Sequence, residues 1–195
     1  MPNWCYSSYI VTGDKTEIRD LYEKMKSLAE RETSLVDNGF GKTWLGNLVA
    51  LLGGDWKTIY CRGDYDTLEI DPDASVVRFT VCSAWSEPSD VISFLKSKFH
   101  NLEFYYMAEE CGTGHFVTND ASGEYFPERY YFSEPDACES CYYTEGELAD
   151  FLSNVSQFIG KEVKTAEEAC EAVHDYNEST DYSCYAEARI YKVVD

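Results

Sequence analysis

The order of the patterned segments over residues 4–108 constrains the fold more than any other feature of this sequence. Alternating apolar and polar residues mark strands, and apolar residues three or four positions apart mark helices. The segments are a strand at 4–12, a helix at 15–32, strands at 67–70 and 76–85, a helix from Pro88 and a strand at 102–108. This order is that of a split βαβ unit, which predicts an antiparallel four-stranded sheet with two helices on one face.

The remaining segments complete an α+β fold. Residues 38–62 are expected to be an insertion after the first helix, with a short helix at 44–52 and a short strand at 58–61. Capping boxes at Thr144–Glu147 and Thr165–Glu168 each precede an apolar stripe at helical spacing. A closing strand is predicted at 182–194. We expect a first domain at 1–133 and an acidic extension of helices and strands at 134–195 that packs on it.

Negative charge is concentrated in the C-terminal half of the chain. The net charge is −20, and residues 100–195 carry 21 acidic and 5 basic side chains against 15 and 11 in residues 1–99. Such a chain repels nucleic-acid phosphates and anionic membranes, so we expect neither as a partner. Its charge suits basic protein surfaces or divalent cations as partners. Solubility alone is the alternative explanation of the charge.

The apolar runs and the N-terminal segment favour a cytoplasmic protein. No apolar run approaches the ~20 residues of a membrane span, and the start of the chain lacks the basic and apolar regions of a secretory signal. The 8 cysteines are therefore expected to be reduced, and most of them to be small buried side chains.

Three motifs carry a resemblance to a known family. They are Met1-Pro-Asn-Trp-Cys5, Ser83-Ala-Trp-Ser-Glu-Pro88 and the segment Leu95–Gly114. The second is similar to a T-A-W-S-P-P motif before the second helix, although Glu87 stands where the family more often has proline. Together they resemble the YubB-type ferredoxin-like family of plasmid, phage and other mobile-element proteins. The resemblance implies a ferredoxin-like fold and a mobile-element origin, without an iron–sulfur cluster and without assigned catalytic residues. Trp4 and Trp85 are then expected to be core anchors.

Several patterns that suggest chemistry are incomplete. The segment Asp37–Thr43 is similar to the end of a phosphate-binding loop, but Val36 occupies the position of a required glycine. Cys138 and Cys141 form a single C-x-x-C, whereas a structural zinc site takes four ligands, so we expect no metal there. We also expect no cofactor and no catalytic residue. The alternative is a cation-dependent enzyme that uses the adjacent carboxylates Glu109 and Glu110.

The sequence therefore favours a non-enzymatic interaction protein over that enzyme and over a purely structural module. Its acidic half is expected to engage a basic surface of a host protein, as a nucleic-acid mimic or an inhibitor. Tyrosines between residues 105 and 143 interleave with acids and suit a protein-binding face. The predicted binding residues are Glu134, Asp136, Glu139, Glu145, Glu147, Asp150, Glu167, Glu168, Glu171 and Asp175.

Overall fold

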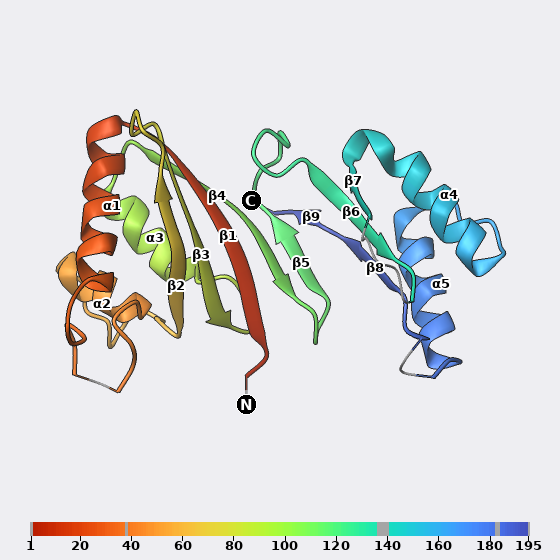
Figure 1. Cartoon of the computed structure of the whole chain (residues 1–195), viewed down its shortest axis with the longest axis horizontal. Coiled ribbons are helices and arrows are strands. Elements are labelled where there is room, and N and C mark those ends of the chain that lie inside the picture. The colour runs from red at the N-terminus through yellow and green to blue at the C-terminus, as the bar shows by residue number, and fades with distance from the viewer. Residues whose placement is uncertain (1, 38, 136–140, 182–183, 195) are drawn as a thin grey trace. The chain divides into compact units, whose positions relative to one another are not determined.

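The computed structural model of the chain (Figure 1) is a mixed α+β protein, as predicted. It describes residues 2–37, 39–135, 141–181 and 184–194. The chain divides into two compact units, Met1–His115 and Phe116–Asp195. This division lies earlier in the chain than the predicted domain boundary after residue 133. The reason is that residues 128–133 pair with two strands of the second unit.

The first unit has the predicted order of strands and helices. Its strands lie side by side in the order β2-β3-β1-β4, and each adjacent pair is antiparallel. The elements are β1 (Trp4–Gly13), α1 (Lys15–Ala29), α2 (Leu45–Leu51), β2 (Gly63–Ile70), β3 (Val76–Ala84), α3 (Ser89–Lys98) and β4 (Leu102–Glu110).

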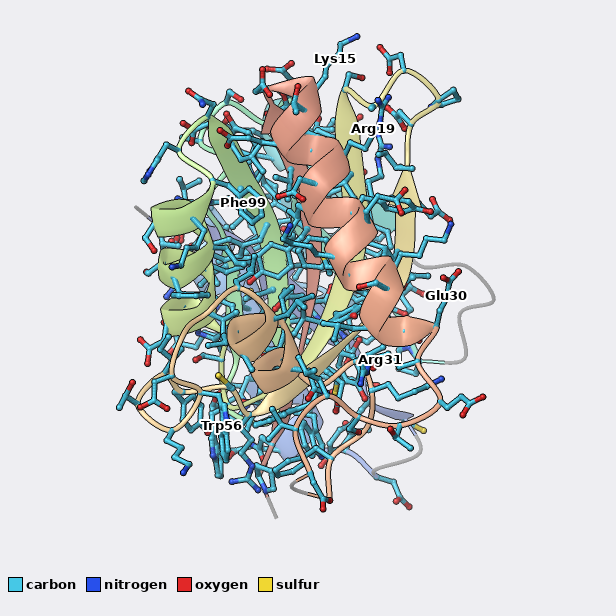
Figure 2. The ribbon with its side chains drawn as sticks, turned by 90° about the vertical axis from the view of Figure 1, so that its left-hand side faces the viewer. Lys15, Arg19, Glu30, Arg31, Trp56 and Phe99 are labelled. Carbon is cyan, nitrogen blue, oxygen red and sulfur yellow. The ribbon has the colours of Figure 1, made fainter. Side chains whose placement is uncertain are left out.

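Helix α1 begins where the sequence predicts, because the Asp14 side chain accepts hydrogen bonds from the backbone N–H groups of Thr16 and Glu17. Figure 2 shows α1 running across the strands from Lys15 and Arg19 to Glu30 and Arg31. Its apolar stripe is fully buried against the inward side chains of β1 and β3, which places the core of this unit between the helices and the sheet. The stripe consists of Ile18, Leu21, Met25 and Leu28.

The insertion between α1 and β2 contains the predicted short helix, α2. The buried Asn47 in α2 accepts a hydrogen bond from the backbone N–H of Val36 and donates to the carbonyl oxygens of Gly41 and Lys42. The predicted strand at 58–61 is wrong. Residues 58 and 59 belong to a turn instead, in which the carbonyl of Asp55 accepts from their backbone N–H groups.

The prediction that Trp4 and Trp85 are core anchors is also wrong. Their side chains are 44% and 50% exposed. Alternation along β1 has the opposite phase, since Cys5 and Tyr9 point into the core and Trp4 points away from it. Trp85 follows the end of β3 with a φ of 75°, a left-handed conformation that turns the chain out of the sheet.

The second unit builds its own core from strands and two helices. Its elements are β5 (His115–Thr118), which begins at the unit boundary, β6 (Glu128–Ser133), β7 (Cys141–Thr144), the 3₁₀ turn η1 (Glu145–Glu147), α4 (Leu148–Ile159), α5 (Ala166–Glu178), β8 (Glu187–Ile190) and β9 (Lys192–Val193). Strands β7 and β8 flank β6 in antiparallel pairing, and residues 117–118 of β5 pair in parallel with β9. Both predicted helices are confirmed, whereas β7 was not predicted and the closing strand is two short strands.

Phe132, Phe151 and Val173 bring β6, α4 and α5 into one core in the second unit. Gly160 ends α4 with a φ of 73°, and the turn after it is held by a 3.0 Å hydrogen bond from the Val163 N–H to the Ser156 hydroxyl. Across this turn the rings of Phe158 and Tyr176 pack edge to face, 4.8 Å apart. None of the described helices combines the length and the apolar character that crossing a membrane requires.

Candidate functional site

Helix α5 carries a continuous row of carboxylates on its exposed side. At 3.6 residues per turn these side chains lie within about 100° of the helix circumference. We call them the acidic face of α5: Glu167, Glu168, Glu171, Asp175 and Glu178, all exposed. The opposite side of the helix buries Ala169 and Val173 in the core of the second unit. The amphipathic pattern therefore fixes which side of α5 faces solvent.

Part of this face opposes helix stability. Glu171 lies four residues from both Glu167 and Asp175, a spacing at which like charges repel by about 0.2–0.5 kcal/mol per pair. Asp175 and Glu178 also lie near the negative end of the helix dipole, and the last turn contains no basic residue. Among the described residues, a basic side chain contacts this face at Glu178, whose carboxylate lies 3.5 Å from the His174 ring, and both side chains are exposed.

Two of the predicted binding residues have a structural role at a helix start. The Glu147 carboxylate accepts a 2.8 Å hydrogen bond from the Thr144 N–H, and that of Glu168 accepts one of 2.8 Å from the Lys164 N–H. Glu147 completes the predicted capping box with Thr144. At the start of α5 the Thr165 hydroxyl accepts from the Glu168 N–H as predicted, but the Glu168 carboxylate binds the N–H of the residue before that cap. Their negative charge is still exposed, so each carboxylate both caps a helix and adds to the surface charge.

Glutamates near the starts of α4 and α5 both affect the pKa of one tyrosine. Burial, followed by the negative charges of Glu145 and Glu167, raises the pKa of Tyr130 in β6. Glu145 precedes α4 and Glu167 begins α5, so the acids before α4 lie within electrostatic range of the acidic face. Asp150, in the first turn of α4, is likewise exposed.

A groove of about 490 Å³ runs beside the acidic face. It is formed by the turn after α4 and by α5, and it includes Lys161 and Lys164 together with Glu168, Glu171 and Asp175. Within the described part of the chain neither lysine forms an ion pair with these acids. The acidic face is thus bordered by two cations that do not neutralise it.

The described part of the second unit exposes far more acid than base. Thirteen of its acidic side chains are exposed, against the three lysines at 161, 164 and 192. Its arginines are withdrawn from the surface: Arg129 is buried and donates to the Asp120 carbonyl, and Arg189 stacks on the rings of Phe116 and Tyr131. The negative charge is therefore a property of the surface as well as of the composition.

The predicted binding residues divide into three groups. Glu167, Glu168, Glu171 and Asp175 come together on α5, and Glu145, Glu147 and Asp150 lie at the start of α4. Glu134 is exposed just beyond β6, and Asp136 and Glu139 lie outside the described residues. Glu178 belongs to the acidic face but was not predicted. Extending the helical spacing by one more turn beyond Asp175 would have found it.

The carboxylates Glu109 and Glu110, proposed as catalytic in the alternative reading of the sequence, point to opposite faces of β4. Glu110 is buried, and its oxygens accept from the N–H of Gly112 at 2.5 Å, from the N–H of Thr113 at 2.9 Å and from the Thr113 hydroxyl. Because both oxygens of Glu110 already accept hydrogen bonds, this carboxylate stabilises the turn after β4 and is poorly suited to bind a cation.

No cluster of three or more metal-ligating side chains occurs among the described residues. Cys111 and Cys141 are exposed, while Cys138 lies outside the described residues. His115, which follows Cys111 by four residues, forms a 2.8 Å contact with the Glu87 carboxylate. Comparison of the chain with protein-family models, curated proteins and solved structures gave no match.

Proposed function

We propose that the second unit binds a basic protein surface through the acidic face of α5. The observation that carries this proposal is the row of five exposed carboxylates along a single helix, two of them at the end where acids disfavour the helix. Acidic residues at positions where they destabilise their own helix are typical of a surface that is retained for binding.

The spacing of the row supports a mimic of nucleic acid. Glu167 and Glu178 are separated by about 16 Å along the helix axis, at a rise of 1.5 Å per residue. Five carboxylates over that length give one charge per about 3–4 Å, comparable to the 3.4 Å per phosphate along one strand of DNA. The partner that fits is a protein whose Lys and Arg side chains otherwise contact phosphates. The protein would then act as an inhibitor of that partner.

We further propose that the first unit is a ferredoxin-like domain of the YubB-type family, of mobile-element origin. Its β-α-β-β-α-β order and its strand order β4-β1-β3-β2 support the fold assignment, and the motifs at residues 1–5, 83–88 and 95–114 support the family. No disulfide joins two of the seven described cysteines, which supports a reducing compartment such as the cytoplasm.

Calorimetry with an oligo-arginine peptide as the probe tests the binding face. The triple variant Glu171→Gln/Asp175→Asn/Glu178→Gln removes three charges from the acidic face. At about 0.2–1 kcal/mol per exposed charge contact, it should weaken binding by about 3–150-fold. Affinity of the unaltered protein should fall with added salt, because screening shortens the range of these charges.

The matched control is Glu23→Gln/Glu32→Gln/Glu103→Gln in the first unit, which changes the net charge by the same amount at three exposed side chains. It should leave most of the affinity intact. Equal losses in the two variants would show that net charge alone attracts the peptide, and the proposal would be wrong. In a second assay, host proteins captured on the protein should be released by duplex DNA.

A further inference from the structure

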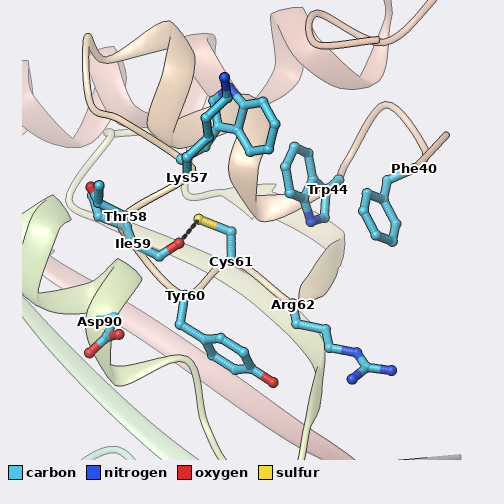
Figure 3. A pocket seen from close by; sticks show the side chains of 10 residues that line it. Phe40, Trp44, Lys57, Thr58, Ile59, Tyr60, Cys61, Arg62 and Asp90 are labelled. Atoms are coloured by element: carbon cyan, nitrogen blue, oxygen red, sulfur yellow. Dashed lines mark hydrogen bonds between the residues drawn. The ribbon is translucent and has the colours of Figure 1, made fainter. Parts of the chain in front are cut away.

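The first unit contains an aromatic cavity that the acidic face does not explain. Its volume is about 510 Å³, within the range of small-molecule sites. It lies between the insertion and the start of α3 (Figure 3). Aromatic rings form its walls: Phe40 stacks on Trp44 at a centroid distance of 5.0 Å, and Trp56 meets Trp44 edge to face at 5.4 Å.

The walls of this cavity are held in place by the fold. Trp44 is 5% exposed and lies directly over Gly46 of α2, where a Cβ atom would come within 2.1 Å of the indole ring. Asn47 fixes the loop that carries Phe40, through its hydrogen bonds to Gly41 and Lys42. Trp44 and Cys61 thus form a buried floor, while the other lining residues are partly or fully exposed and leave the cavity open to solvent.

One hydrogen-bond donor in the wall has no acceptor. The indole Nε1 of Trp44 is buried and forms no hydrogen bond. Figure 3 shows this nitrogen on the edge of the ring that faces Cys61 and Arg62. Buried indole N–H groups ordinarily have a partner, so this donor points to an acceptor supplied by a ligand.

The charged side chains that line the cavity are mostly basic, although the chain as a whole is acidic. Lys57 and Arg62 line it with one acid, Asp90, although the net charge of the chain is −20. Within the described residues neither cation forms an ion pair, and the Lys57 ammonium lies over the Trp56 ring, 5.5 Å from its centroid. Burial, followed by the charge of Asp90, raises the pKa of the Cys61 thiol to about 11, so that this thiol is neutral and does not repel an anion.

We propose that this cavity binds a small planar aromatic anion. Its ring packs on the surface that Phe40, Trp44 and Trp56 form together, and its anionic group pairs with the Arg62 guanidinium. One of its acceptors takes the Trp44 N–H once the exposed Phe40 ring moves aside, because this nitrogen is buried in the unliganded protein. An aryl carboxylate and a mononucleotide share this chemistry, since both join a flat ring to an anionic group.

The four tryptophan indole N–H signals in ¹H–¹⁵N spectra of the full chain provide the test. The probes are indole-3-acetate and adenosine monophosphate, each with a neutral counterpart, indole-3-acetamide and adenosine. Addition of at least one anion should shift the signals of Trp44 and Trp56 and leave those of Trp4 and Trp85 in place. The anion that binds more tightly identifies carboxylate or phosphate as the preferred group.

Arg62→Gln should weaken the binding of that anion by about tenfold or more, because a charge-assisted hydrogen bond is lost. The control Arg19→Gln removes the same charge from α1, and Figure 2 shows Arg19 and Trp56 at opposite ends of this unit. It should leave the affinity unchanged. Trp44→Phe keeps a ring but removes the donor, and should weaken binding as monitored through Trp56.

The proposal fails if neither anion shifts the Trp44 signal, or if the neutral counterparts bind as tightly as the anions. It also fails if tetramethylammonium binds more tightly than both anions, which would make the cavity a cage for cations. Because Arg62 is exposed, Arg62→Gln should leave the fold intact. It therefore tests the proposal even if Trp44→Phe does not fold.

Discussion

The hydroxyl of Tyr65 in β2 donates a 2.6 Å hydrogen bond to the backbone carbonyl oxygen of Met25 in α1, 40 residues earlier in the chain. Both side chains are buried in the core of the first unit. This contact joins the helix to a strand at the edge of the four strands described for this unit, and it fixes where the second half of α1 lies on the sheet.

Tyr65→Phe should therefore lower the free energy of unfolding of the first unit by about 1 kcal/mol, the usual net value of one hydrogen bond. Tyr65→Ala should cost about 3–5 kcal/mol, because it also leaves a cavity. Urea unfolding followed by tryptophan fluorescence measures this unit selectively, since all four tryptophans lie in it. Tyr60→Phe, at a half-exposed side chain, is the control and should have no measurable effect.

Acid should weaken the turn after β4. Hydrogen bonds from the Thr113 hydroxyl and from the backbone N–H groups of Gly112 and Thr113 hold the pKa of Glu110 below its ordinary value of 4.5. Because the folded pKa is the lower one, this contribution to stability is complete above pH 4.5 and is lost as the pH falls through the folded pKa. Glu110→Gln should thus destabilise the protein near neutral pH, and the difference from the unaltered protein should shrink in acid.

Unfolding curves at a series of pH values measure that difference. Glu103→Gln, an exposed position on the same strand, serves as the comparison and should show little destabilisation at any pH. A loss for Glu110→Gln that stays constant from neutral to acid pH would mean that shape, and not charge, determines the role of this side chain.

The left-handed backbone at Trp85 predicts that a glycine variant is more stable than an alanine variant. With a φ of 75°, this residue bears a strain of about 1–2 kcal/mol that glycine does not have. Both Trp85→Ala and Trp85→Gly remove the half-exposed indole, but the glycine variant should be the more stable by about 1 kcal/mol. Thermal unfolding of the two variants measures this difference in stability. A more stable alanine variant would contradict the strained conformation.

Asp175→Lys should stabilise α5 while it weakens binding of the basic probe. The change replaces a repulsive i,i+4 pair with Glu171 by an attractive one and places a cation near the negative end of the helix dipole, a gain of about 0.5–1 kcal/mol. Hydrogen exchange of the α5 backbone amides measures the gain.

Asp150→Lys provides the opposite case, because Asp150 lies in the first turn of α4, where the dipole favours an acid. This variant should destabilise its helix by a similar amount. If Asp175→Lys leaves the affinity for oligo-arginine unchanged, then the C-terminal part of the acidic face is not part of the binding surface.

Local signals in the sequence determined the helices and their starts. The capping box before α4, the Thr165 cap of α5 and the Asp14 cap of α1 act over three or four residues, so they can be identified without knowledge of the rest of the fold. The acidic face of α5 was equally accessible, because helical spacing alone places Glu171 and Asp175 on the same side. The order of strands and helices in the first unit followed from the same local periodicities.

Only the tertiary structure decided which side of each strand is buried. An alternating segment is compatible with either phase, and the packing of α1 against β1 selected Tyr9 and left Trp4 exposed. The role of Glu110 depends on a turn that brings Gly112 and Thr113 back to its oxygens. The aromatic cavity combines residues 40–62 with Asp90 of α3, and the unit boundary depends on the pairing of β6 with β8. These contacts join residues far apart in the chain, and periodicity within a single segment carries no information about them.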